Sequence, residues 1–406
     1  MIVTGERGGI VGENFLSKRV RHYLSERPSV IGSDDPVEIL GGILAAFSGG
    51  FRVALEDEPA ESREGSENVR LPASDDSDAT GSQSEDLEEI RNALLQERSK
   101  GEVVLYTSGT TGKPAAVSHG WKSLFRGARV GPKHQGAVWA LCYNPSHVAG
   151  LQVLLQAFLN DCDIVDLFHA DPADRSGLLR ESGVTHLSAT PSWLRILISD
   201  LAGEPPFESV KSVTLGGERF DARLAEAAKE SFPNAQFRNI YASTEVGTLL
   251  VSDGDIFTVP DFLEDAVRIE DGRLLVSPAM LADSREGTDA WYDSGDRVEV
   301  LSENPVRFRF VGRDSDNVSV GGYNVNLAEV ESRLRGHSGV REARVSARPN
   351  SVLGQILTAE VVPEGPALEE KDLRKYLGKH FPPHAVPRMI RSVEELSLSR
   401  TGKLER

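Results

Sequence analysis

The chain has 406 residues, 39% of them hydrophobic, and a formal net charge of −17 at pH 7. This length suggests two to three domains with ample apolar residues for a core. The negative charge argues against a nucleic-acid backbone as a partner, and the sequence lacks the run of about 18 apolar residues that a membrane span needs. The N-terminus has no signal-peptide pattern, and Cys142 and Cys162 lie in hydrophobic surroundings, so we expect a reduced, cytoplasmic protein.

The first hundred residues carry few recognisable signals. Residues 39–47 predict a helix and residues 51–55 a strand. Residues 56–89 contain thirteen acidic residues and two arginines, so they carry −11 of the net charge of −17. This stretch is rich in Ser, Gly and Pro and short of large apolar residues, which is typical of disorder. We therefore predict a flexible acidic loop over residues 56–100.

The strand-like run at residues 103–106 leads into a loop of small and hydroxylic residues that ends in a lysine. Gly109 and Gly112 allow a close backbone approach to a ligand, and exposed N–H groups then form an anion nest. The hydroxyl groups and the lysine add donors suited to phosphate. The candidate phosphate-binding residues are Thr107, Ser108, Gly109, Thr110, Thr111, Gly112 and Lys113.

The spacing of this loop excludes a Walker A motif, which requires G-x-x-x-x-G-K-[ST]. Here only two residues separate Gly109 from Gly112, and Pro114 follows the lysine. The sequence therefore disfavours a P-loop kinase. An ordinary polar surface turn stays open as the alternative for this loop taken by itself.

Three shorter motifs follow in the middle of the chain. Residues 143–150 (Y-N-P-S-H-V-A-G) place His147 within an apolar stretch, where histidines are more often structural than catalytic. Residues 215–218 (L-G-G-E) alone read as a generic turn. In residues 241–247 (Y-A-S-T-E-V-G), the carboxylate of Glu245 can hold magnesium while Thr244 meets a phosphate oxygen.

The C-terminal part adds three more motifs. Residues 292–296 (Y-D-S-G-D) end in Asp296, whose carboxylate has about four acceptor sites for a ribose diol. The alternative is a turn that caps a hairpin. Residues 310–323 contain Arg313 and a glycine pair, and Asn326 is a predicted N-cap for a helix over 327–334. Lys403 lies near the C-terminus, where a solvated charge is the ordinary interpretation.

The order of these motifs resembles that of the adenylate-forming (AMP-binding) ligases, which include acyl-CoA synthetases, adenylation domains of peptide synthetases and luciferases. Residues 106–114 are similar to the family's phosphate-loop signature, although Ala115 stands where the family usually has lysine. Ser315 likewise departs from the aspartate or lysine usual at the family's hinge. The likeness covers residues 100–406 and is to acyl-CoA synthetases such as o-succinylbenzoate–CoA ligases, with a shortened N-terminal region.

The resemblance implies a role for each matching residue. Glu245 would be the metal ligand, Thr244 a phosphate contact, and Tyr241 would stack on adenine. Asp296 and Arg313 would hold the ribose. The remaining expected site residues are the catalytic Lys403, His147 as a positioning group beside the substrate carboxylate, Gly217 and Glu218 at the adenine and acyl pocket, and Gly322 in the loop that enters for the second step.

The implied reaction uses ATP and Mg²⁺ to convert a carboxylic acid into an acyl-adenylate, with release of pyrophosphate. A thiol then accepts the acyl group, either from coenzyme A or from the pantetheine of a carrier protein supplied in trans. No aspartate that would hold an amino-acid ammonium lies near His147, which favours a simple carboxylic acid. We expect no nucleic-acid partner, and the chain is compatible with a homodimer.

The predicted fold class is α/β, because apolar strand-like runs alternate with amphipathic segments from residue 101 to about 311. By resemblance this part belongs to a large, multi-layered N-terminal adenylation domain, residues 1–311. Residues 312–406 then form a small α+β C-terminal lid domain, with a hinge at residues 313–316.

Two alternatives leave the phosphate and ribose motifs unchanged. In the first, an amine or another nucleophile captures the adenylate in place of the thiol. In the second, the chain is a degenerate, non-catalytic nucleotide-binding homologue, which Ala115, Ser315 and the short N-terminal region favour and which the intact Lys113 and Lys403 oppose.

Overall fold

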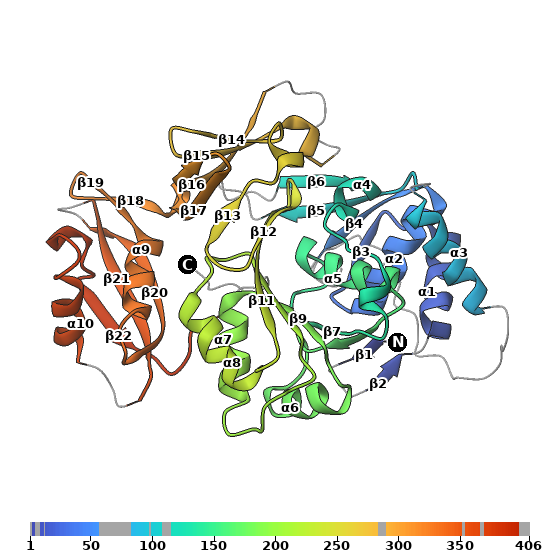
Figure 1. Ribbon diagram of the computed structural model, residues 1–406, viewed down its shortest axis with the longest axis horizontal. Coiled ribbons are helices and arrows are strands. Elements are labelled where there is room, and N and C mark those ends of the chain that lie inside the picture. The colour runs from blue at the N-terminus through green and yellow to red at the C-terminus, as the bar shows by residue number, and fades with distance from the viewer. Residues whose placement is uncertain are drawn as a thin grey trace. The chain divides into compact units, whose positions relative to one another are not determined.

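The computed structural model describes residues 2–4, 9–11, 13–56, 83–96, 99–107, 115–282, 290–350, 354–365 and 369–397. The chain divides into two compact units (Figure 1). The first comprises residues 1–257 and 277–290, and the second comprises residues 258–276 and 291–406. No helix among these described residues is long and apolar enough to cross a membrane.

The first unit is built on an eight-stranded sheet with the order β12-β11-β10-β9-β7-β8-β1-β2. Its strands are β1 (Ile2–Thr4), β2 (Gly9–Val11), β7 (Val138–Leu141), β8 (Asp163–Asp166), β9 (His186–Ala189), β10 (Ser212–Gly216), β11 (Gln236–Ser243) and β12 (Gly247–Ser252). All neighbours from β11 to β1 are parallel, and β12 and β2 are antiparallel to their neighbours. The segments that follow β7, β10 and β11 therefore lie along one edge, where ligands bind in open α/β sheets.

Four helices of this unit follow parallel strands: α5 (Val148–Leu159), α6 (Pro172–Glu181), α7 (Pro191–Asp200) and α8 (Ala222–Ser231). Polar caps fix where two of them begin. The Thr190 hydroxyl accepts from the N–H of Trp193, and the Asp221 carboxylate accepts from the first N–H groups of α8. Such caps satisfy N–H groups that have no partner within the helix. They therefore fix the residues at which α7 and α8 begin.

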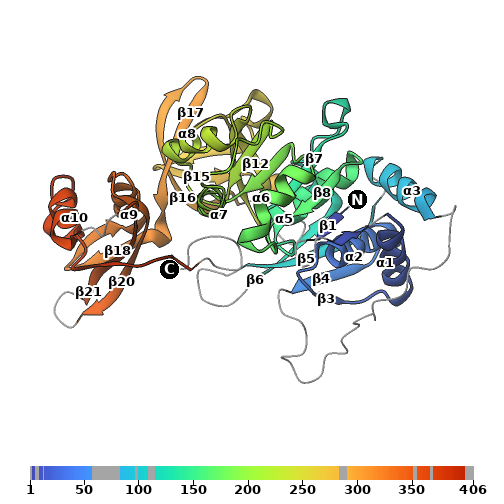
Figure 2. The ribbon, with the colours of Figure 1, turned by 90° about the horizontal axis from the view of Figure 1, so that it is seen from below.

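A four-stranded sheet forms the second layer, with the order β3-β4-β5-β6. Figure 2 shows it beside α1 and α2. Its strands are β3 (Val30–Gly32), β4 (Arg52–Glu56), β5 (Glu102–Thr107) and β6 (Ala115–Gly120), and the accompanying helices are α1 (Glu13–Glu26), α2 (Pro36–Gly49), α3 (Gln83–Leu95) and α4 (Trp121–Phe125). Leu44 of α2 and Leu151 of α5 share one core with Val103 and Leu141, which come from the two sheets. The two helices thus pack between the sheets.

The described residues of the second unit form three further sheets and two α-helices. A five-stranded sheet has the order β13-β17-β16-β15-β14, β18 pairs with β19, and a three-stranded sheet has the order β20-β21-β22. Val330 of α9 and Leu373 of α10 share a core with Val345 and Leu357, so the helices cover one face of the three-stranded sheet. The elements are β13 (Ile256–Thr258), β14 (Val267–Glu270), β15 (Arg273–Val276), β16 (Tyr292–Glu303), β17 (Val306–Arg313), β18 (Asn317–Val320), β19 (Tyr323–Asn326), α9 (Leu327–Arg335), β20 (Val340–Asn350), β21 (Gly354–Pro363), α10 (Glu370–Leu377) and β22 (Met389–Ser392).

Most of the elements expected from the sequence are present, and the Asn326 cap of α9 is confirmed, with its side chain accepting from the N–H of Glu329. The prediction of a loop over the whole of residues 56–100 is wrong, because α3 and the start of β5 lie within that range. Leu87 and Leu94 are buried and Ile90 packs on the same core, so their helical spacing outweighed the local charge. Residues 57–82 lie outside the described part. The expected boundary at residues 311 and 312 stays a prediction, since the compact units divide elsewhere.

Candidate active site

The predicted phosphate loop lies between two paired strands. β5 and β6 are antiparallel, and their register runs from Glu102 opposite Gly120 to Thr107 opposite Ala115. Residues 108–114 therefore connect the ends of a hairpin. The expected ligands Ser108, Gly109, Thr110, Thr111, Gly112 and Lys113 lie outside the described residues, as does the side chain of Thr107. Their contact with phosphate stays a prediction.

Predicted residues from three separate motifs come to one edge of the eight-stranded sheet. His147 precedes α5 just after β7, Glu218 follows β10, and Tyr241 lies near the end of β11. Gly217 has φ of +83°, a conformation that side chains disfavour. The carboxylate of Glu218 accepts from the N–H of Ser192, at 2.9 Å, which ties the turn after β10 to the start of α7.

The turn from Ser243 to Gly247 joins β11 to β12 and carries Thr244 and Glu245. Both side chains are half-buried. Within the described residues no cation pairs with the Glu245 carboxylate, and the buried Ser243 hydroxyl has no hydrogen-bond partner. Hydroxyl and carboxylate oxygens are the donors that Mg²⁺ prefers. The residues of this turn therefore fit the expected metal.

His119 is a buried histidine that was not anticipated from the sequence. It is fully buried on β6, and its Nδ1 lies 3.1 Å from the hydroxyl of Ser123. Burial lowers the pKa of His119 to about 4, a backbone group of Thr244 partly opposes this shift, and the charge of Arg126 adds to it. The ring is therefore neutral at pH 7. A single histidine in an apolar run gave no signal of this contact.

In the second unit, the two predicted ribose contacts are paired with each other. Asp296 and Arg313 are opposite one another in the register of β16 and β17, and Arg313 Nε donates to Asp296 Oδ1 at 2.6 Å. Asp296 is only 5% exposed, whereas the side chain of Arg313 is 52% exposed. The arginine can therefore orient the carboxylate while keeping part of its guanidinium accessible.

The predicted hinge is held by acidic side chains on both sides of Ser315. Asp314 forms ion pairs with Arg273 and Arg297, each at 2.6 Å, and Asp316 accepts from the N–H of Arg313. That these residues act as a hinge stays a prediction. Gly322, with φ of +85°, lies in the turn between β18 and β19.

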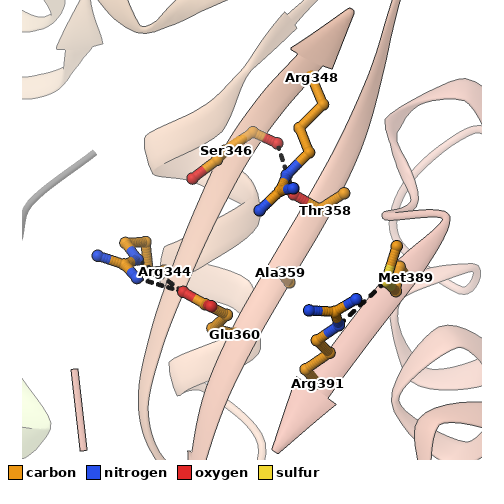
Figure 3. A pocket seen from close by; sticks show the side chains of 8 residues that line it. All are labelled: Arg344, Ser346, Arg348, Thr358, Ala359, Glu360, Met389 and Arg391. Carbon is orange, nitrogen blue, oxygen red and sulfur yellow. Dashed lines mark hydrogen bonds and ion pairs between the residues drawn. The ribbon is translucent and has the colours of Figure 1, made fainter. Parts of the chain in front are cut away.

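A pocket on the second unit does not include any of these residues. It lies on the face of the β20-β21-β22 sheet opposite α9 and α10 (Figure 3), and its polar lining includes Arg344, Glu360 and Arg391. Arg344 is paired with Glu360 across the strands. We assign this pocket no part in the expected reaction. The predicted catalytic Lys403 lies outside the described residues.

Family models match both parts of the chain. The model described as AMP-binding enzyme matches residues 51–270, and the model described as AMP-binding enzyme C-terminal domain matches residues 329–403. The chain belongs to the AMP-binding enzyme family. The expected family, and with it the fold of a large adenylate-forming domain followed by a small C-terminal one, is confirmed.

Similar proteins include both synthetases of peptides and ligases of coenzyme A. The chain is 27% identical over 361 residues to tyrocidine synthase 3 of Brevibacillus parabrevis, a match that covers 75% of this chain but only 5% of that protein. It is also 27% identical over 336 residues to a 2-succinylbenzoate–CoA ligase of Listeria monocytogenes, covering 77% of this chain and 71% of the ligase.

Solved structures share the fold at lower identity. The o-succinylbenzoate CoA synthetase of Bacillus subtilis, in complex with its acyl-adenylate intermediate, matches with a TM-score of 0.65 and 18% identity, over 99% of this chain and 93% of that one. ATP-bound MatB of Rhodopseudomonas palustris matches with a TM-score of 0.68 and 17% identity, over the same shares of the two chains.

Proposed function

We propose that this protein uses ATP to activate a carboxylic acid as an acyl-adenylate and then transfers the acyl group to a thiol. The observation that carries the proposal is the Thr244–Glu245 turn, which fits Mg²⁺ and lies at the carboxyl edge of a sheet in an AMP-binding enzyme. The 2-succinylbenzoate–CoA ligase relative supports the thiol step. The synthetase relatives keep a carrier-protein thiol, or an amine, as the alternative acceptor.

In the first half-reaction, a carboxylate oxygen attacks the α-phosphorus, the bond to the β-phosphate oxygen breaks, and pyrophosphate leaves. Residues 107–113 bind the β- and γ-phosphates, and Thr244 donates to a phosphate oxygen. Glu245 would hold Mg²⁺, which when bound would supply positive charge to the phosphates. Asp296 and Arg313 hold the ribose, and Tyr241 stacks on the adenine. Catalysis of this kind depends on positioning and on stabilising charge.

Lys403 supplies positive charge to the transition state of this step, which in a closed site is typically worth several kcal/mol. His147 positions the acid at its carboxylate end, and Gly217 and Glu218 line the adenine and acyl pocket. In the second half-reaction, the thiol sulfur attacks the acyl carbon and AMP leaves. We further propose that residues 312–406 rotate about residues 313–316, removing Lys403 and bringing in the loop that contains Gly322.

The test is release of pyrophosphate from ATP with a panel of aryl, short-chain and medium-chain acids, each with and without coenzyme A. We expect one class of acid to give release that collapses in Lys403→Ala, and coenzyme A to accelerate turnover. If no acid raises release above the Lys403→Ala background while ATP still binds, the ligase proposal is wrong and the non-catalytic alternative stands.

A further inference from the structure

The residue just after helix α4 donates hydrogen bonds to the main chain beside Glu245. Arg126 follows α4 directly, and its Nη1 donates to the carbonyl oxygen of Met280 at 2.6 Å and to that of Val246 at 3.1 Å. A guanidinium nitrogen of this kind carries two hydrogens, so one group can serve both carbonyls. Hydrogen bonds from a charged donor are also roughly twice as strong as neutral ones.

The two carbonyls belong to two chain segments, and these segments are also joined by a direct hydrogen bond at Glu245. Val246 is the next residue in the chain, and the N–H of Ala282 donates to the carbonyl oxygen of Glu245 at 2.8 Å. The main chain at Glu245 and Val246 is therefore fixed to residues 280–282 by one direct bond and by Arg126. We call this set of three hydrogen bonds the Arg126 clamp.

Close backbone packing makes the clamp rigid. A Cβ atom at Gly127 would lie 2.7 Å from Cβ of Thr248, and one at Gly247 would lie 3.0 Å from the carbonyl oxygen of Ser123. The Thr248 hydroxyl in turn donates to Gln152 of α5 at 2.9 Å. These close contacts couple α4 to β12, so we expect a shift of α4 to displace the turn that carries Glu245.

α4 also begins where the phosphate-loop hairpin ends, since β6 runs to Gly120 and α4 starts at Trp121. Nδ1 of His119 on β6 lies 3.1 Å from the hydroxyl of Ser123 on α4. One short helix is thus connected at its start to the strand that follows the phosphate loop, and at its end to the turn with the metal-binding carboxylate. Helix α4 therefore connects the predicted phosphate loop to the turn that carries Glu245.

From this geometry we propose that Arg126 is a positioning residue for magnesium: it fixes the backbone at Val246 so that the Glu245 carboxylate faces the metal. This inference rests on the proposed function, in which Glu245 holds Mg²⁺. Groups that orient metal ligands typically contribute about 10- to 100-fold in metal affinity or activity. Mg²⁺ demands near-ideal octahedral geometry, so a displaced carboxylate weakens metal binding before it weakens nucleotide binding.

The test measures the equilibrium Kd of ATP by calorimetry, once with saturating Mg²⁺ and once with EDTA. For Arg126→Met we expect the Kd with Mg²⁺ to rise about tenfold or more, and the Kd with EDTA to stay within about twofold of wild type. Arg126→Lys, which retains a charge and several hydrogens on one nitrogen, should recover part of the loss. The control is Arg91→Met, which removes a 2.9 Å bond to the carbonyl of Phe158 elsewhere in the same unit and should change neither Kd.

Three outcomes separate the possibilities. If neither Kd changes in Arg126→Met, the positioning role is overturned. An equal loss with and without Mg²⁺ overturns it as well, because that pattern indicates general damage to the nucleotide site. If Arg126→Met does not fold, Arg126→Gln gives the same two criteria. If wild type itself shows no magnesium enhancement, the proposed function has failed, and not only the inference about Arg126.

Discussion

The Glu245 turn and the Asp296–Arg313 pair are held in place by different kinds of contact. Around Glu245, the fixing contacts are hydrogen bonds from Arg126 to backbone carbonyls and the close packing of two glycines. Around Asp296, they are ion pairs whose arginine side chains are 38% to 52% exposed. Packing and backbone bonds respond little to salt, whereas exposed ion pairs are weak and screened. The turn that carries Glu245 is therefore the rigid part, and the Asp296–Arg313 pair the adaptable one.

The largest effect in this comparison is expected at Glu245, the proposed metal ligand. Glu245→Gln keeps the shape of the side chain but removes its charge, so we expect pyrophosphate release to fall by about 10²- to 10³-fold. The measurement is acid-dependent release at saturating ATP. Glu264→Gln, an exposed change on the second unit, is the control. A loss of less than about threefold in Glu245→Gln would contradict the assignment of Glu245.

The next largest effect is expected at the ribose contact. Asp296→Asn removes a buried carboxylate that accepts from Arg313, and a hydrogen bond to a charged group contributes about 1.5–3 kcal/mol. We expect the Kd of ATP to rise by about 10- to 100-fold. Asp293→Asn alters an exposed ion pair on the same strand and should change the Kd by less than about threefold. Similar values for the two variants would show that Asp296 does not bind the ribose.

A pair of glycines tests the rigidity of α4. Gly127→Ala introduces a Cβ against Thr248, and overpacking of this kind costs about 1–3 kcal/mol. Gly177→Ala lies within α6 with no atom inside 4 Å of the new methyl group, so higher helix propensity should stabilise it by about 1 kcal/mol. The measurement is urea unfolding of each variant. Equal stability of the two proteins would mean that α4 is not closely packed on β12.

The smallest effect is the dependence of stability on pH at His119. Its pKa of about 4 in the fold lies below the ordinary 6.5, so its contribution is present above pH 6.5 and is lost as the pH falls toward 4. Between pH 7 and 5.5, wild type should lose about 1 kcal/mol more of its unfolding free energy than His119→Gln. The interval from pH 8 to 9, where the ring is neutral in both states, is the control. Parallel curves below pH 7 would contradict the burial of a neutral ring.

The sequence predicted the elements and the site to different degrees, for physical reasons. Strands such as residues 103–106 and caps such as Asn326 were predictable because periodicity and short polar side chains act locally. Helix α3 was not predicted, because the high negative charge of its segment outweighed the helical spacing of its buried Leu87 and Leu94 in our interpretation. The role of Arg126 could not be predicted from the sequence, because its partners are the backbone carbonyls of Val246 and Met280. Every residue has such a carbonyl, so the partners leave no pattern in the sequence.

The pairing of β1 with β8 has a consequence for biosynthesis. Ile2 lies opposite Ile164 in a parallel register, so β1 is synthesised before the distant strand with which it pairs. Parallel pairing between distant segments is slow and leaves strand edges uncovered in the meantime. We infer that this edge of the main sheet is completed late, after the α2 and α5 core has begun to collapse, and that folding yield is sensitive to the rate of translation across residues 138–166.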